Sequence, residues 1–329
     1  MDSLNISMDA NKTLSVDNWI EEALLPSIFL GICFLIGIPG NTLVIWTVLF
    51  KLKQRSITVM VIVNLAVADF VVLFTLPLWI HSLLDAWYYG LAACKVLTYV
   101  IYSTMYSSVF LITLMSLDRF IAIIFPISSK TWRKKNILYS IITGIWMLAL
   151  VFAIPVLFVQ TTVVRNGHVK CIERLYTSDQ QHIAVLLLET LIGFIIPVSV
   201  LSVSYTCVAK RIKKMTFQRK NRSEKLIACI VIAFALCWLP YHLLNIIGII
   251  AISVKHSCPE TSRTLLNGIT TAENIAGALS FISNCLNPIL YGFTAWSIHR
   301  NLKTSFIQLF RQLASIPKEN HTEHTSLGF

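Results

Sequence analysis

The segment Cys94–Pro126, CKVLTYVIYSTMYSSVFLITLMSLDRFIAIIFP, is a long apolar run with a cysteine at its start and an acid–base pair near its end. At about 1.5 Å per residue, some twenty helical residues cross the roughly 30 Å hydrocarbon core of a bilayer. The run therefore predicts a transmembrane helix. Its charged pair is Asp118 and Arg119, and such groups at a membrane helix end need partners. From this segment alone, Arg119 either snorkels to the interface or has a function.

The composition of the chain is that of an integral membrane protein. Of its 329 residues, 56% are hydrophobic and 13% are charged, whereas soluble domains carry about 25% charged residues. The net charge of +11 does not indicate nucleic-acid binding, because the basic residues lie in short segments between apolar runs. The eight cysteines form no close CxxC pair, which argues against a zinc or redox motif. The polar, acidic start of the chain predicts no cleaved signal peptide.

Apolar runs recur along the chain and are separated by mostly short polar connections. Each is long enough to cross a bilayer, and they cover residues 24–50, 57–84, 92–125, 137–159, 182–209, 226–254 and 264–293. The last run is the least regular, because residues 264–278 are polar. No internal repeat is visible, which argues against a transporter built from inverted repeats. We therefore predict an all-α membrane protein with a seven-transmembrane helix bundle over residues 23–294.

Lysine and arginine residues predict the orientation of the bundle, because they concentrate in cytoplasmic loops. The first, third and fifth connections, the end of the third run and the C-terminal tail together hold 20 of the 27 basic residues. This side is predicted to face the cytosol, so the N-terminal tail, residues 1–22, faces outside. Asn5 and Asn11 begin Asn-x-Ser/Thr triplets in that tail and are predicted glycosylation sites.

The chain after the last run is amphipathic. Apolar residues recur there at three- and four-residue steps, with basic residues between them. This pattern predicts an amphipathic helix on the inner membrane surface over residues 295–313. Residues 314–329 are polar and predict a disordered cytoplasmic tail.

Cys94 and Cys171 are both predicted to lie outside, in an oxidising compartment where disulfides persist. A bridge between them would hold the second outer loop over the mouth of the bundle. Closing so long a loop stabilises a protein by about 4 kcal/mol in the loop-entropy treatment. The alternative is two free thiols.

Several polar residues lie deep inside the predicted spans. Asp69 is the most conspicuous, since an unpaired carboxylate in a membrane costs about 3 kcal/mol or more. The others are Asn41, Ser108, Ser283, Asn284 and Asn287. Oxygen atoms from several helices around one carboxylate suit a small hard cation. A hydrogen-bonded cluster without a metal is the alternative, and spacing alone favours that alternative.

Prolines interrupt the sixth and seventh runs, in CWLPYH at Pro240 and NPILY at Pro288. Proline removes a backbone hydrogen bond and bends a helix. Such a bend is a candidate hinge for motion at the cytoplasmic end.

Taken together, these motifs resemble those of class A (rhodopsin-like) G-protein-coupled receptors from end to end. The motifs that carry the resemblance are Gly40-Asn41, NLAVAD at 64–69, Cys94 with Cys171, DRF at 118–120, Trp146, Pro197 with Tyr205, CWLP at 237–240 and NPILY at 287–291. The resemblance implies a heterotrimeric G protein as partner, with arrestin and receptor kinases as further partners. It implies no enzymatic activity, and the chain has no HExxH or GxSxG motif.

The resemblance also assigns roles to individual residues. It implies a sodium ion, as an allosteric ligand and not a cofactor, at Asp69, Ser108, Asn284 and Asn287. It implies that coupling and activation depend on Asp118, Arg119, Tyr205, Pro240, Asn287, Pro288 and Tyr291. Phe120 replaces the usual tyrosine, and Lys220 lies in the region where many members have an acid that locks Arg119.

Two missing side chains exclude known classes of ligand. No lysine occurs in residues 264–293, which excludes a retinal Schiff base, and Ile101 stands where amine receptors carry Asp. Aromatic walls with a few polar groups suit an amphipathic ligand. The predicted contacts are Thr98, Tyr102, Glu189, Trp238, Tyr241, His242, Asn245 and Glu273. Trp79, His81 and Tyr106 are further candidates, and core packing is the alternative for each, above all for Trp79 and Tyr106.

Several stretches resemble leukotriene B4 receptors, within the chemoattractant branch. They are GLAACK, residues 104–119, HIAVLLLETLIGFIIP at 182–197 and LPYHLLNII at 239–247. Glu189 matches a family ligand contact, but Thr98 and Gln160 replace a histidine and an arginine. A fatty-acid carboxylate needs a cation, and the outer candidates are Lys95, Lys170, Arg174, His182 and Arg263.

The resulting hypothesis is a plasma-membrane receptor for leukotriene B4 or a related eicosanoid, acting in chemotaxis and inflammation. The short basic loop 214–221 resembles receptors that couple to inhibitory G proteins. A peptide or chemokine receptor is the first alternative, although the N-terminal tail has neither tyrosine nor cysteine. A seven-span transporter is the second.

Overall fold

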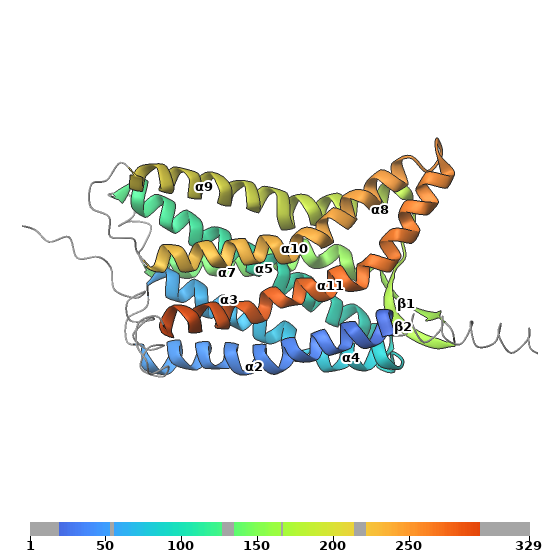
Figure 1. Cartoon of the computed structure of the whole chain (residues 1–329), viewed down its shortest axis with the longest axis horizontal. Helices are drawn as coiled ribbons and strands as arrows, with labels where there is room; N and C mark the ends of the chain where they lie inside the picture. Colours follow the sequence, from blue (N-terminus) through green and yellow to red (C-terminus); the bar gives the residue numbers. More distant parts are fainter. Residues whose placement is uncertain (1–19, 53–55, 127–134, 166, 214–221, 297–329) are drawn as a thin grey trace, which may run out of the picture.

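The computed structural model of the protein is an elongated bundle of membrane-spanning helices that lie side by side along the long axis (Figure 1). It describes residues 20–52, 56–126, 135–165, 167–213 and 222–296. The predicted glycosylation sites Asn5 and Asn11, most of the tail 1–22, most of the amphipathic helix 295–313 and the tail 314–329 lie outside these residues.

The helices follow the predicted runs closely. The spans are η1 (Ile20–Leu24) with α2 (Leu25–Lys51), α3 (Ile57–Phe74) with α4 (Leu76–Leu84), α5 (Gly90–Ile124), α7 (Lys135–Val159), α8 (Asp179–Thr190) with η2 (Leu191–Ile195) and α9 (Ile196–Lys213), α10 (Arg222–Ser253), and α11 (Pro259–Trp296). Six of the spans are long and apolar enough to cross a membrane throughout. In α11 only Ile275–Leu290 is strongly apolar, which matches the polar stretch seen in its sequence.

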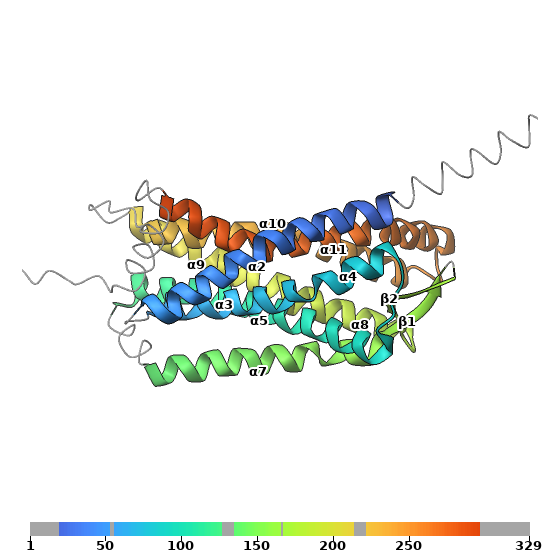
Figure 2. The ribbon, with the colours of Figure 1, turned by 90° about the horizontal axis from the view of Figure 1, so that it is seen from below.

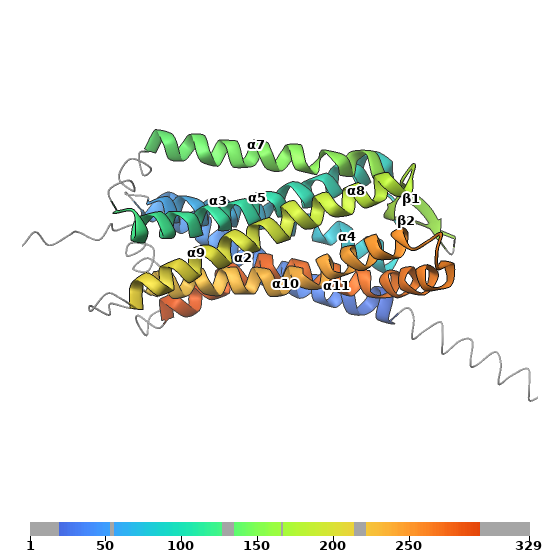
Figure 3. The ribbon, with the colours of Figure 1, turned by 90° about the horizontal axis from the view of Figure 1, so that it is seen from above.

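The long helix α5 forms the centre of the bundle. It packs against α3, α7, α9 and α10, and α7 lies at one outer side (Figures 2 and 3). Tyr106, Leu111, Ile112 and Met115 of α5 are buried in the main core. Lipid tails are as apolar as these side chains, so close van der Waals packing holds such helices together more than water exclusion does.

Small residues allow α2 and α11 to approach closely. A methyl group added at Gly40 would lie 2.7 Å from Cβ of Pro288, and one added at Gly37 would lie 3.2 Å from Cβ of Cys285. Side chains at these places would push the helices apart. The interface therefore belongs to the small-residue type that membrane helices favour.

Two of the spans are interrupted where the sequence analysis predicted continuous runs. The second breaks at Thr75, whose hydroxyl donates to the Val72 carbonyl at 2.7 Å, and Pro77 lies in the first turn of α4. The fifth contains the π-helical segment η2 shortly before Pro197. By contrast, α10 and α11 continue through Pro240 and Pro288, and both bend along their length (Figure 1).

A β-hairpin, which the sequence analysis did not predict, covers one end of the helical bundle. Strand β1 (Gln160–Arg165) pairs antiparallel with β2 (His168–Arg174), and Gly167 adopts the left-handed φ of 80° at the turn. The second outer loop is long enough to fold back on itself, and Thr161, Val163 and Val164 favour strands. We call this end the hairpin end.

Two tethers hold the hairpin against the helices. The predicted disulfide joins Cys94 at the start of α5 to Cys171 of β2. The Lys170 ammonium donates to the carbonyls of Ser82 and Asp85 at 2.7 and 2.6 Å, beside the last turn of α4. Cations are favourable at this helix end because its carbonyls lack intrahelical partners. Burial lowers the pKa of Lys170.

Candidate ligand and cation sites

A cavity of about 450 Å³ lies inside the bundle below the hairpin. This volume is within the range of sites for drug-sized ligands. Its walls come from α2, α3, α4, α5, β1, β2, α10 and α11, and include Leu30, Trp79, Ile101, Met105 and Phe281. Among its lining residues in the described ranges, Arg174 is the only lysine or arginine and Glu273 the only acid.

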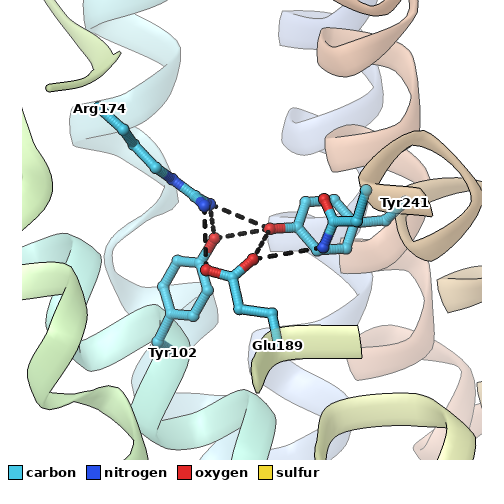
Figure 4. A network of polar contacts seen from close by, with 5 residues as sticks. Tyr102, Arg174, Glu189 and Tyr241 are labelled. Carbon is cyan, nitrogen blue, oxygen red and sulfur yellow. Dashed lines mark hydrogen bonds and ion pairs between the residues drawn. The ribbon is translucent and has the colours of Figure 1, made fainter. Parts of the chain in front are cut away.

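Arg174 extends from the end of β2 into the bundle and meets a carboxylate there (Figure 4). Its Nη1 lies 2.9 Å from Oε1 of Glu189, and the two side chains are only 17% and 3% exposed. Burial acts to lower the pKa of Arg174, but the Glu189 carboxylate and nearby tyrosines outweigh it and raise that pKa. The guanidinium therefore remains charged at any physiological pH.

Two tyrosines complete the network around this ion pair (Figure 4). Nη2 of Arg174 donates to the hydroxyls of Tyr102 and Tyr241, the latter at 3.0 Å. Tyr241 in turn donates to Oε2 of Glu189 at 2.8 Å. Its single proton is used in that bond, so Tyr102 is the donor in the 2.7 Å contact between the two hydroxyls.

The remaining donor to Glu189 is Nδ2 of Asn245, at 3.3 Å from Oε2. Both oxygens of this buried carboxylate are thus bonded, as a charge in a low-dielectric interior requires. The network joins the hairpin to α5, α8 and α10. The end of the bundle beneath the hairpin is therefore closed by side chains that a polar ligand could displace.

The predicted ligand contacts divide into three groups in the structure: those that line the cavity, those that lie behind its wall, and His242, which does neither. Those that line the cavity are Thr98, Tyr102, Trp238, Tyr241 and Glu273, together with the further candidate Trp79. Glu189 and Asn245 lie behind them and act on the cavity through Tyr241 and Arg174. His242 does not line the cavity but stacks on Phe194, with ring centroids 4.8 Å apart. Tyr106 packs with Phe110 and Phe152, as its core alternative predicted.

Only one of the five outer cations named from the sequence enters the cavity. Lys95 donates to the Leu157 carbonyl at 2.8 Å, and Lys170 binds the end of α4. His182 stacks on Tyr176, and Arg263 is exposed. The sequence did not single out Arg174, although its place three residues after Cys171 could have suggested that the disulfide directs it inward.

A second, much smaller cavity lies deeper in the bundle. It has a volume of about 10 Å³, about the size of one water-sized probe. All four predicted cation-site residues line it: Asp69, Ser108, Asn284 and Asn287. Ser283 lines it as well.

Asp69 is only partly satisfied by the protein around it. Its Oδ2 accepts a hydrogen bond from Nδ2 of Asn287 at 2.8 Å, and Oδ1 has no hydrogen-bond partner among the described residues. The side chain is 1% exposed. A buried carboxylate oxygen of this kind, in a cavity lined by oxygen atoms, fits a small hard cation.

The two cavities are connected through α11. Asn284 lines both of them. Trp238, at the inner end of the large cavity, donates from Nε1 to Oγ of Ser283 at 3.1 Å. A ligand that moves Trp238 would therefore disturb the wall of the small cavity.

Of the predicted coupling residues, Asp118, Arg119 and Tyr205 lie toward the end of the bundle opposite the hairpin. Asn287 instead lines the small cavity, and Pro240 lies two residues after Trp238 of the large cavity. Arg119 donates from Nη2 to the hydroxyl of Thr58 on α3. Asp118, its neighbour in sequence, is buried. Tyr205 is half-buried on α9 and packs against the main core. Tyr291 belongs to α11, and its side chain lies outside the described part of the structure, as does Lys220.

Comparison with known proteins identifies the class to which this bundle belongs. The family model "7 transmembrane receptor (rhodopsin family)" matches residues 40–291. The chain is therefore a member of the rhodopsin family of G-protein-coupled receptors, a multi-pass membrane protein and not an enzyme.

Its curated relatives include two kinds of receptor. The chain is 34% identical to leukotriene B4 receptor 1 of Homo sapiens over 288 residues, which cover 87% of this chain and 81% of the relative. Identity to leukotriene B4 receptor 1 of Rattus norvegicus is 35%, with 87% and 80% covered. Identity to chemerin-like receptor 2 of Mus musculus is 32%, with 91% and 82% covered. The chain is thus homologous to chemoattractant receptors.

Proposed function

We propose that the protein is a plasma-membrane receptor for leukotriene B4 or a closely related hydroxylated fatty acid. The observation that carries this proposal is the position of Arg174, the one lysine or arginine in the described wall of a largely apolar cavity. A long acyl chain suits the apolar wall, and a carboxylate suits a guanidinium that can bind two oxygens at once. The similarity to leukotriene B4 receptors supports the same ligand class.

Ligand binding on this proposal is an exchange of partners. The carboxylate of the ligand takes over part of the guanidinium of Arg174, which now serves Glu189 and two tyrosines. A ligand hydroxyl replaces Tyr241 or Arg174 as a donor to Glu189. After the exchange the two carboxylates share one guanidinium, so one negative charge is in excess. Hydrogen bonds from the ligand hydroxyl, Tyr241 and Asn245 then have to satisfy the oxygens of Glu189 that Arg174 no longer contacts.

The signal would pass from the large cavity to the opposite end through Trp238 and α11. Asp69 and its oxygen-rich neighbours would hold sodium in the inactive packing, as the small cavity and the unpartnered Oδ1 support. Agonist would favour a state in which α10 and α11 move at Pro240 and Pro288. By linkage, sodium and agonist then oppose each other.

The end opposite the hairpin would bind the G protein. With the N-terminus outside, the hairpin end faces the extracellular space and Arg119 faces the cytosol, in accord with the distribution of basic residues. Arg119, Asp118, Tyr205 and Tyr291 would contribute to coupling, and an inhibitory G protein is the proposed partner. Arrestin and receptor kinases would act on the same side.

Ligand-dependent nucleotide exchange on the purified receptor with an inhibitory G protein tests this function. We expect leukotriene B4 to drive exchange and chemoattractant peptides not to. Activation by peptides alone would favour the alternative suggested by the similarity to chemerin-like receptor 2. Pertussis toxin should block most of the cellular response, and an undiminished response would exclude the inhibitory subtype.

The role of Arg174 is tested with two forms of one ligand. Arg174→Gln should weaken binding of the free acid of leukotriene B4 far more than binding of its methyl ester, because only the acid carries a full charge. Arg263→Gln, at an exposed site on α11, is the matched control and should leave both unchanged. Equal losses for acid and ester in Arg174→Gln would mean that Arg174 has only a structural role.

A further inference from the structure

Two cysteines from different spans meet inside the bundle, away from the disulfide of the hairpin. Sγ of Cys33 on α2 and Sγ of Cys285 on α11 are 3.7 Å apart, although the residues are 252 positions apart in sequence. They are 3% and 5% exposed. Neither ligand contact nor G-protein coupling accounts for this pair.

The surrounding packing brings the thiols together and keeps them there. Gly37, one turn after Cys33, lets the backbone of α2 approach α11, because any side chain there would crowd Cys285. The Cys285 thiol also contacts the Ile282 carbonyl at 3.2 Å. A disulfide needs the sulfur atoms to close from 3.7 Å to about 2.05 Å.

We propose that Cys33 and Cys285 form an oxidisable dithiol whose disulfide fastens α11 to α2. The oxidant is a small uncharged peroxide, which can enter the 450 Å³ cavity. Leu30, Val72 and Phe281 line that cavity and also pack in the same apolar cluster as the two cysteines. The apolar cluster that holds the thiols therefore borders the cavity that the peroxide enters.

The reaction balances without any other reactant. The sulfur of one cysteine attacks a peroxide oxygen and becomes a sulfenic acid, with release of water. The sulfur of the second cysteine then displaces the hydroxyl group, so that the S–S bond forms and a second water leaves. Two thiols are oxidised and one peroxide is reduced to two waters.

The cross-link would act on the part of the receptor that has to move. Cys285 lies two residues before Asn287, which holds Asp69, and three before Pro288. A bond at this point restrains α11 against α2 next to the small cavity. It would also close a loop of some 250 residues, which stabilises the folded chain by restricting the unfolded one.

The full receptor in lipid nanodiscs, treated with hydrogen peroxide and then denatured and alkylated, tests this directly. We expect the number of alkylated cysteines to fall by two from the six that are free. Peptide mapping should show a Cys33–Cys285 linked peptide, and the thermal midpoint should rise by about 5 °C or more. Two thiols that remain alkylatable after peroxide treatment would overturn the proposal.

Variants separate this pair from its neighbours. Cys33→Ala and Cys285→Ala should each abolish the linked peptide and the rise in thermal midpoint. Cys207 is a half-buried free cysteine on α9, so Cys207→Ala should retain both. Cys237 also lies on a helix that packs against α11. A linked peptide containing Cys237 in place of Cys33 would overturn the assignment of the disulfide to Cys33 and Cys285. Peptide mapping of the oxidised wild-type receptor is sufficient to reveal it.

Discussion

Glu189 and Asp69 are both carboxylates buried within membrane spans, and the protein treats them differently. Glu189 has bonds to both oxygens and an arginine as its ion-pair partner. Asp69 accepts one hydrogen bond from the Asn287 amide, and its other oxygen has no partner in the described part of the chain. The partner of Glu189 comes from a loop, whereas the neighbours of Asp69 all come from spans. At Glu189, a ligand can displace the contacts that a loop residue makes. At Asp69, the surrounding helices leave a cavity with room only for a small ion or a water molecule.

The largest effect is expected from removing the arginine. Arg174→Ala should destabilise the receptor by about 3–5 kcal/mol, because it leaves Glu189 buried and unpaired. The thermal midpoint of the receptor without ligand measures this. The double variant Arg174→Met/Glu189→Gln should recover most of the loss, since no unpaired charge remains.

An exposed ion pair provides the matched control for that experiment. Lys255 and Asp179 are 3.0 Å apart, but their side chains are 51% and 40% exposed. Lys255→Ala should therefore cost under about 1 kcal/mol. Similar shifts in Arg174→Ala and Lys255→Ala would show that burial does not distinguish the two pairs.

The second-largest effect tests whether the disulfide of the hairpin positions Arg174 in the cavity. Cys171→Ala should destabilise the receptor by about 4 kcal/mol, because the hairpin loses its covalent tether to α5. If the tether positions Arg174, the losses in Cys171→Ala and Arg174→Ala should not add in the double variant. Full additivity would mean that the ion pair forms without the disulfide.

A smaller, ion-dependent effect is expected at Asp69. Sodium should lower the affinity of wild-type receptor for leukotriene B4 by a coupling of about 1–3 kcal/mol. Asp69→Asn should remove this dependence on sodium. Glu189→Gln should keep it, because both Glu189 oxygens are already bonded to protein groups and do not bind a cation. Radioligand binding in sodium and in a bulky organic cation measures the difference. A sodium effect that survives in Asp69→Asn would exclude this cavity as the cation site.

The smallest effect concerns the last donor to Glu189. Asn245→Ala removes only a 3.3 Å hydrogen bond, so the receptor should lose about 1 kcal/mol, seen as a small fall in thermal midpoint. The carboxylate keeps Arg174 and Tyr241. A loss as large as that of Arg174→Ala would show that Asn245, and not the ion pair, stabilises this network.

Much of the fold could be read from the sequence because the membrane imposes a strong pattern. Run length predicted the spans, and the polar residues around Asp69 were brought together as expected. The hairpin was not foreseen, although the tether at Cys171 was, because the contacts of Lys170 with the end of α4 cannot be read from sequence spacing. Arg174 was one of five candidate cations, since sequence spacing does not tell which way a loop side chain points. His242 was placed in the ligand site by its neighbours in the motif, but its side of α10 faces Phe194.

The π-helical segment η2 has a consequence for anyone who aligns or transplants the fifth span. Such a segment holds one residue more per turn than the α-helix on either side. Deleting one residue as Leu191–Ile195 became α-helical would keep the two halves of the span in phase, because the π segment absorbs about one extra residue. Winding all five residues as regular α-helix would rotate the outer part of the span by about 100°. Glu189 would then turn away from Arg174 while Tyr205 stayed in place. The extra residue in η2 therefore determines which face of the outer half points to the ligand site. A chimera that replaced η2 by the same number of α-helical residues would keep Glu189 in the sequence but turn it away from the bundle.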